Sequence, residues 1–103
     1  MKIYISGKIT GLPMEVALAN FRYYAYIIKE TGNTAINPME LPHKHNKRWE
    51  SFMKEDIAAL MSCDAIIIMD NYQNSKGARL ELDLAMLLDI KIFFSIPQLQ
   101  LRK

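Results

Sequence analysis

The sequence predicts a three-layer α/β sandwich of the flavodoxin or Rossmann type, built on a small parallel sheet of four or five strands in the order 2-1-3-4. Two observations lead to this prediction. Short β-branched and aromatic runs alternate along the chain with longer segments of helical spacing. The run AIIIM at residues 65–69 is apolar at every position, which is typical of a parallel strand buried on both faces. Helical crossovers between such strands are right-handed and make the strands parallel, and we expect the first and third to be central.

The individual elements follow from this alternation in chain order. Strands are expected at residues 2–6, 34–36, 64–69 and 91–94. Helices are expected over residues 14–32 and 49–63, and from Asn74 or Ser75, either of which is a good N-cap. Gly32 suits the C′ position of the first helix, because glycine tolerates a positive φ there. Pro97 and the polar tail QLQLRK are expected to end the chain without a further element.

The length and composition of the chain limit the classes of protein to which it can belong. The 103 residues suit one domain over residues 1–103, and half of them are hydrophobic, which is enough for one core. Thirteen basic and eleven acidic residues leave a net charge of +2, a balance that does not favour nucleic acid as a partner. The single cysteine, Cys63, suits a reducing, cytoplasmic compartment. No signal peptide is expected and no apolar run is long enough to cross a membrane, so no membrane partner is expected.

The chain is expected to form a homodimer or a larger homo-oligomer. A core of this size is only moderately stable alone, and the segment YYAYII within residues 21–28 has more apolar surface than one helix face needs. The basic stretch HKHNKR at residues 43–48 is interpreted as a solvated loop, with a nucleic-acid contact as the alternative. His43 and His45 have no accompanying Cys or acidic cluster, so no metal site is expected there.

The place of a ligand site follows from the fold class. Doubly wound sheets bind ligands beyond the carboxyl ends of their strands. In this chain those places are the loops at residues 6–13, 37–48 and 70–74, with the helix starts that they feed. Two carboxylates, Asp56 and Glu81, lie on helices that follow these loops.

Asp56 has an unusual place on its helix. At about 100° per residue, it falls inside an apolar arc made by Trp49, Phe52, Met53, Ile57 and Leu60. An ionised carboxylate in that arc is costly unless it is hydrogen-bonded or paired. Two interpretations are open: a buried aspartate that ties down a loop, or an aspartate that points into a pocket.

Glu81 lies near the start of the helix that follows Ser75. The positive end of a helix favours the ionised form of a carboxylate, which a nucleophile requires. Gly77 lies four residues earlier on the same face, where it is expected to leave room for a ligand above Glu81 and to offer its amide to an anion. The alternative is ordinary helix polarity, because glutamates near helix starts are common.

Four stretches carry a resemblance to a known family: KIYISGKITG, the pair NP at residues 37–38, WESFMKEDIAALMSCDAIII, and NSKGARLELDLA. Together they cover most of the chain. Each is weak alone, but as an ordered set they resemble the nucleoside 2-deoxyribosyltransferase superfamily. The chain is most similar to the short members of that superfamily, which also includes 5′-monophosphate N-glycosidases.

The resemblance implies catalytic roles for three matching positions. Glu81 matches the glutamate that attacks the anomeric carbon of the sugar. Tyr4 matches a tyrosine that helps to place that glutamate, although from the residues alone Tyr4 is better interpreted as a core aromatic. Asp56 matches an aspartate of the middle helix that lies near the sugar or the base.

The resemblance also implies substrate contacts. Gly7 matches a loop along the nucleoside, and Lys8 is a cation that could substitute for an arginine of the hydrolases, where this chain has Thr10. Ser75 lies six residues before the matching glutamate, where the monophosphate hydrolases carry serine and the nucleoside transferases an acid. A hydroxyl can donate to a 5′-phosphate that an acid would repel, so Ser75 and Gly77 are expected at the 5′ end of a phosphorylated substrate.

The activity implied is that of an N-glycosidase or 2-deoxyribosyltransferase, a hydrolase or transferase of nucleotide metabolism. Its partner is a small molecule, a nucleoside 5′-monophosphate or a nucleoside, and it needs no cofactor or metal. The sugar passes to water or to a second base. The family often has glycine where this chain has Asp83, a change that could alter packing or a subunit contact. The alternative function is a non-catalytic nucleotide-binding module of the same fold.

Overall fold

The computed structural model describes residues 1–42 and 48–101. Its elements in chain order, with η for a short 3-10 helix, are β1 (Lys2–Ser6), α1 (Met14–Glu30), β2 (Thr34–Ile36), η1 (Pro38–Glu40), α2 (Trp49–Met61), β3 (Ala65–Ile68), η2 (Asp70–Asn74), α3 (Lys76–Leu87), β4 (Lys91–Phe93) and α4 (Ile96–Gln100). The expectations for His43, His45 and most of the basic stretch lie outside the described residues. Within the described part, no helix is both long and apolar enough to cross a membrane.

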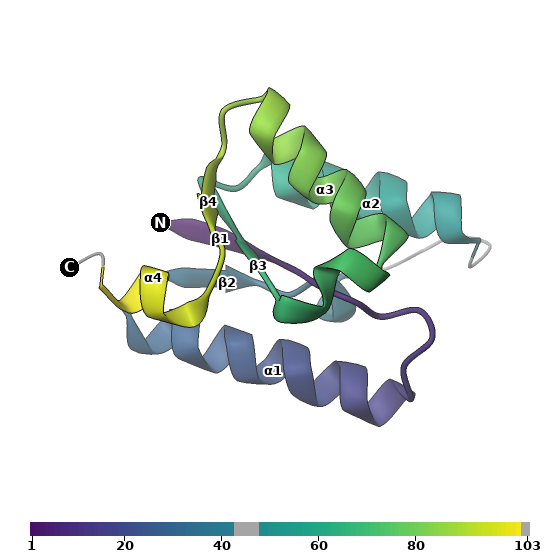
Figure 1. Ribbon diagram of the computed structural model, residues 1–103, viewed down its shortest axis with the longest axis horizontal. Coiled ribbons are helices and arrows are strands. Elements are labelled where there is room, and N and C mark those ends of the chain that lie inside the picture. Colours follow the sequence, from purple (N-terminus) through teal and green to yellow (C-terminus); the bar gives the residue numbers. More distant parts are fainter. Residues whose placement is uncertain (43–47, 102–103) are drawn as a thin grey trace.

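The four strands form one parallel sheet in the order β2-β1-β3-β4, as the sequence predicts. β1 and β3 are the central strands, and Tyr4 of β1 lies beside Ile36 of β2 and Ile66 of β3. Figure 1 shows α2 and α3 on one face of the sheet and α1 and α4 on the other. The predicted three-layer sandwich is therefore confirmed.

The sheet divides the hydrophobic core into two halves. Side chains alternate between the faces of a strand, so Ile3 and Ile5 of β1 pack with Phe21 of α1, whereas Tyr4 packs on the opposite face with Leu60 of α2. All four side chains from β1 and α1 in these contacts are fully buried. The consequence for function is that the polar end of Tyr4 points into the layer that holds α2 and α3.

α1 and α3 end in the same way. Gly32 has a φ of 83° and donates to the Lys29 carbonyl at 3.0 Å, while Asn33 donates to the Ile28 carbonyl at 3.2 Å. This pair of bonds is a Schellman motif, and it confirms the predicted C′ role of Gly32. At the end of α3 the same position is taken by Asp89, with a φ of 57°.

One prediction about the elements is wrong. Pro97 and the polar tail are expected to end the chain without a further element, but Ile96–Gln100 form the short helix α4, which contains Pro97. The Ser95 hydroxyl caps this helix by accepting a hydrogen bond from the Gln98 amide at 3.3 Å. Proline is compatible with a first helical turn, where its missing N–H has no helical partner anyway. Leu99 then anchors the helix in the core half on the α1 side.

Candidate active site

The carboxylate of Glu81 is buried and accepts hydrogen bonds on both of its oxygens. Tyr4 donates its hydroxyl proton to Oε2 at 2.5 Å, and Ser6 donates its own to Oε1 at 2.7 Å. Only 5% of Glu81 is exposed, and Tyr4 is completely buried. Residues 77 positions apart in the chain therefore meet at one carboxyl group.

The fold explains why these three side chains meet. Tyr4 and Ser6 are two residues apart on β1, so strand alternation presents both on the same face of the sheet. α3 packs over β1 and β3 on that face, and Glu81 is among the residues by which α3 is buried. Ser6 is the last residue of β1, so this group of side chains lies toward the carboxyl end of that strand.

The electrostatics of Glu81 differ from the expectation drawn from its helix position. Burial, with a smaller contribution from the nearby charge of Asp56, raises the pKa of Glu81 to about 7 even though the hydrogen bonds from Tyr4 and Ser6 act to lower it. A carboxylate near the positive end of a helix was expected to stay ionised. That expectation is corrected because the loss of solvation outweighs both hydrogen bonds.

Tyr4 keeps its proton in this environment. Burial raises the pKa of Tyr4 far above its usual value, and the negative charges of Glu81 and Asp56 raise it further. Its hydroxyl is therefore a permanent donor to the Glu81 carboxyl group across the pH range in which proteins are stable.

Asp56 lies on the buried face of α2, where the helical arc places it, with 8% of its surface exposed. Its charge acts on both Tyr4 and Glu81. The structure thus brings Glu81, Tyr4 and Asp56 close enough for their charges to interact. Two carboxyl groups and a phenol are a set of groups typical of acid–base and nucleophilic chemistry.

The space beside Gly77 is filled by side chains of α2. A Cβ atom at Gly77 would stand 3.0 Å from the Met53 sulfur and 3.9 Å from Nε1 of Trp49. Lys76 lies over the same indole, with its ammonium 4.2 Å from the ring centre. The expectation that Gly77 leaves room for a ligand is therefore corrected: the glycine allows α2 and α3 to approach closely.

The other predicted contact residues surround the carboxyl ends of β1 and β3. Gly7 follows β1 directly, and the Met69 side chain fills the place where a Cβ of Gly7 would stand. The Lys8 amide donates to the side-chain oxygen of Asn71 at 3.0 Å, which joins the first loop to η2. Ser75 is the N-cap of α3, and its hydroxyl oxygen accepts from the Ala78 amide at 3.1 Å.

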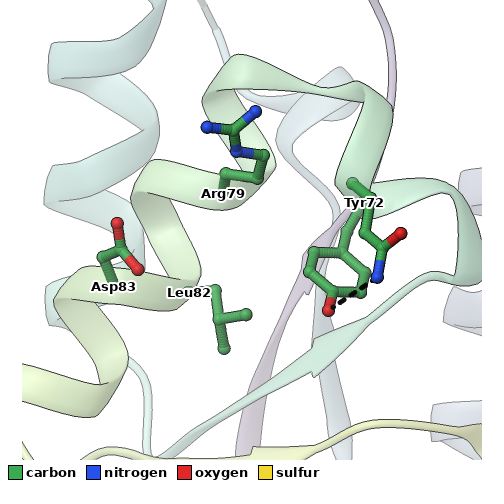
Figure 2. Close-up of a pocket in the computed structure, with 5 residues that line it drawn as sticks. Tyr72, Arg79, Leu82 and Asp83 are labelled. Carbon is green, nitrogen blue, oxygen red and sulfur yellow. Dashed lines mark hydrogen bonds between the residues drawn. The ribbon is translucent and has the colours of Figure 1, made fainter.

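A separate shallow cavity of about 450 Å³ is lined by residues of η2 and α3. Figure 2 shows Arg79, Leu82 and Asp83 along the helix and Tyr72 on the turn before it. Glu81 is not among the lining residues, because its carboxyl group faces β1 instead. Asp83 is exposed at this surface.

Sequence reasoning missed Ser6, which contacts the Glu81 carboxyl group as directly as Tyr4 does. The sequence did contain a signal for this role, because Ser6 is a polar residue at the carboxyl end of a buried strand and two positions after Tyr4.

Cys63 is no candidate for reactivity, since burial raises the pKa of its thiol. In residues 1–42 and 48–101, no three His, Cys, Asp or Glu side chains are grouped so that they could hold a metal ion.

A solved structure of a known protein has a fold similar to that of this chain. A 2-deoxyribosyltransferase from the psychrotolerant bacterium Bacillus psychrosaccharolyticus superposes with a TM-score of 0.68 at 21% sequence identity, over 89% of this chain and 69% of that one. At this identity the similarity establishes a shared fold. A search of curated proteins found no match. Residues 1–94 match the family model described as domain of unknown function DUF4406, and the chain therefore belongs to that family.

Proposed function

We propose that this protein is an enzyme of the nucleoside 2-deoxyribosyltransferase superfamily. It cleaves or transfers at the N-glycosidic bond of a nucleoside 5′-monophosphate or a nucleoside, with Glu81 as the nucleophile. The observation that carries the proposal is the buried Glu81 carboxyl group, held by the Tyr4 and Ser6 hydroxyls at the carboxyl end of a central strand. The fold shared with a 2-deoxyribosyltransferase supports it.

The chemistry follows from a fixed carboxylate beside a sugar. Ionised Glu81 attacks C1′, so a C1′–O bond forms while the C1′–N bond breaks and its electron pair moves to the base. Tyr4 orients the attacking group. The leaving base takes up a proton, and Asp56 is the residue that we propose organises this step. Water or a second base then attacks C1′ and releases Glu81 as a carboxylate.

The 5′ end of the substrate lies at the start of α3 in this proposal. The Ser75 hydroxyl uses its oxygen to cap the helix, which leaves its proton available to donate to a phosphate. The first amides of α3, including that of Gly77, are free of helical partners in an N-terminal turn and favour an anion. Gly7 lies along the nucleoside, and Lys8 adds a positive charge on the same side.

A non-catalytic nucleotide-binding module is the second candidate, and one observation favours it. Glu81 is almost completely buried, and Met53 and Trp49 fill the space beside Gly77, one turn nearer the start of α3. A substrate must displace side chains to reach the carboxyl group. A protein that bound the nucleotide only at the rim would show affinity without turnover.

One experiment separates the two candidates. The wild type is incubated with a panel of nucleosides and 5′-monophosphates, and free base is measured by chromatography. Glu81→Gln keeps the shape of the side chain and should lower the rate by several orders of magnitude. Asp83→Asn, an exposed acid on the same helix, is the matched control and should retain the wild-type rate. Binding of a panel member without release of base would instead favour the binding module.

A further inference from the structure

Ser6, the last residue of β1, holds the Glu81 oxygen that Tyr4 does not. Its hydroxyl donates to Oε1 at 2.7 Å, whereas the Tyr4 hydroxyl donates to Oε2 at 2.5 Å. Ser6 is only 1% exposed. The carboxyl group is therefore held at two points by side chains of one central strand.

We propose that Ser6 is a positioning residue for the Glu81 nucleophile, an inference that rests on the function proposed above. The terminal torsion of a glutamate side chain is broad, so a single bond from Tyr4 leaves the carboxyl plane free to turn about one oxygen. The bond from Ser6 restrains the second oxygen and sets the direction in which the plane faces the sugar. Ser6 acts through Glu81 and needs no contact with the substrate.

The surroundings of Glu81 determine how this role can be measured. The groups whose charge or protons act on the carboxyl group are Tyr4 and Ser6 from β1 and Asp56 from α2, with Cys63 beside Tyr4. Hydrogen bonds from Tyr4 and Ser6 lower the pKa of Glu81, whereas burial and Asp56 raise it. Removal of the Ser6 hydroxyl should therefore move the pKa of Glu81 above about 7.

The kinetic test uses three variants of β1. Ser6→Ala removes the hydroxyl, Ser6→Thr retains it, and Ile5→Val makes a small change in the core on the opposite face of the same strand. A carboxylate that loses one charge-assisted hydrogen bond binds its proton roughly tenfold more tightly. In Ser6→Ala, kcat should therefore fall much more at pH 6 than at pH 9, with KM unchanged. Ser6→Thr should restore the wild-type pH profile, and Ile5→Val should not shift it.

A second measurement does not depend on turnover. The carboxyl carbon of Glu81 is followed by carbon-13 NMR during a pH titration of the unliganded protein, and its signal is identified by its absence in Glu81→Gln. The midpoint should rise in Ser6→Ala and return toward the wild-type value in Ser6→Thr.

The two measurements distinguish the possible failures. If the wild type releases base but neither the kinetic profile nor the NMR midpoint moves in Ser6→Ala, the role of Ser6 is wrong and the proposed function stands. If no panel member releases base, the proposed function fails and Ser6 positions no nucleophile. The NMR midpoint then still reports whether Ser6 restrains the carboxyl group.

Discussion

Burial and hydrogen bonding act in opposite directions on Glu81, and burial is the stronger. Two hydroxyls donate to its oxygens, yet its pKa is about 7 rather than the ordinary 4.5. A group held in this way is half ionised near neutral pH. It can act as a nucleophile above pH 7 and is neutral at pH 5.

The first prediction concerns the dependence of the rate on pH. Attack on C1′ needs the ionised carboxylate, so kcat/KM should rise with pH and level off above about pH 7, the pKa of Glu81. Initial rates measured from pH 5 to 9 test this. Rates that are already level at pH 5 would contradict the prediction, because the group that must be ionised would then titrate below pH 5 and not near 7.

The second prediction concerns stability. The folded pKa of Glu81, about 7, lies above its ordinary value of 4.5, so the folded chain binds this proton more tightly than the unfolded chain. This tighter proton binding adds to the free energy of unfolding. Its contribution is complete below pH 4.5 and is lost as the pH rises to about 7. The loss is about 3 kcal/mol at about 1.4 kcal/mol per pKa unit.

Urea denaturation at pH 5 and pH 8 measures this effect. The free energy of unfolding should be lower at pH 8 than at pH 5 in the wild type and in Asp83→Asn. The difference between the two pH values should be smaller in Glu81→Gln. An equal difference in all three proteins would mean that another group causes it.

At the scale of the element, the start of α3 depends on the N-cap residue Ser75. Ser75 caps the helix through the Ala78 amide, and we propose that it also donates to a 5′-phosphate. Because Ser and Asp are equally good N-caps, substitution at this position can separate the two roles.

The third prediction uses that equivalence. Ser75→Asp should retain the stability of the fold but lower kcat/KM for monophosphates, because the added charge repels the phosphate, and should leave nucleosides unaffected. Ser75→Ala should lose about 1 kcal/mol of stability with the cap and should also weaken monophosphate binding. If Ser75→Asp turns over monophosphates at the wild-type rate, the 5′-phosphate contact is wrong and the plain nucleoside is the better substrate.

The ends of α1 and α3 provide an internal comparison. Both are Schellman motifs, with Gly32 at a φ of 83° in one and Asp89 at 57° in the other. A Cβ at Gly32 would have no neighbour within 4 Å, so backbone conformation alone determines the effect of a side chain there.

The fourth prediction follows from this comparison. Asp89→Gly should stabilise the protein and Gly32→Ala should destabilise it, each by about 1 kcal/mol, because only glycine adopts the left-handed conformation without strain. Thermal denaturation of the two variants measures the shifts. A loss of stability in Asp89→Gly would show that the Asp89 side chain has a stabilising role of its own.

At the scale of the whole molecule, α1 lies on one face of the sheet and α3, which carries Glu81, lies on the other (Figure 1). Tyr23 and Tyr26 on α1 are 55% and 58% exposed. These side chains belong to the apolar segment that leads us to expect a homodimer, and the homodimer stays a prediction. The expectation of one domain over residues 1–103 also stays a prediction.

The fifth prediction is therefore the oligomeric state. Light scattering at micromolar concentration should give the mass of a dimer or a larger assembly, since burial of exposed aromatic rings stabilises such a contact. Tyr26→Glu should reduce that mass if α1 forms the interface. A monomeric mass for the wild type would contradict the prediction.

Most of the fold could be predicted because its signals are local. The all-apolar run in β3, the glycine at the end of α1 and the serine at the start of α3 each act through neighbours within a few residues. α4 was missed because Pro97 was interpreted as a stop signal, although Ser95 before it supplies a cap. The placement of Asp56 on the buried face of α2 also followed from local periodicity.

The sequence by itself determined the four strands, the three longer helices and the order of the strands in the sheet. Only the tertiary structure decided that Tyr4 and Ser6 hold opposite oxygens of Glu81 and that α2 fills the space beside Gly77. The pKa of Glu81 was also decided only by the tertiary structure, because desolvation depends on every layer packed around the carboxyl group and not on the place of Glu81 in its helix. Periodicity acts over one or two turns, whereas these contacts join residues 75 or more positions apart.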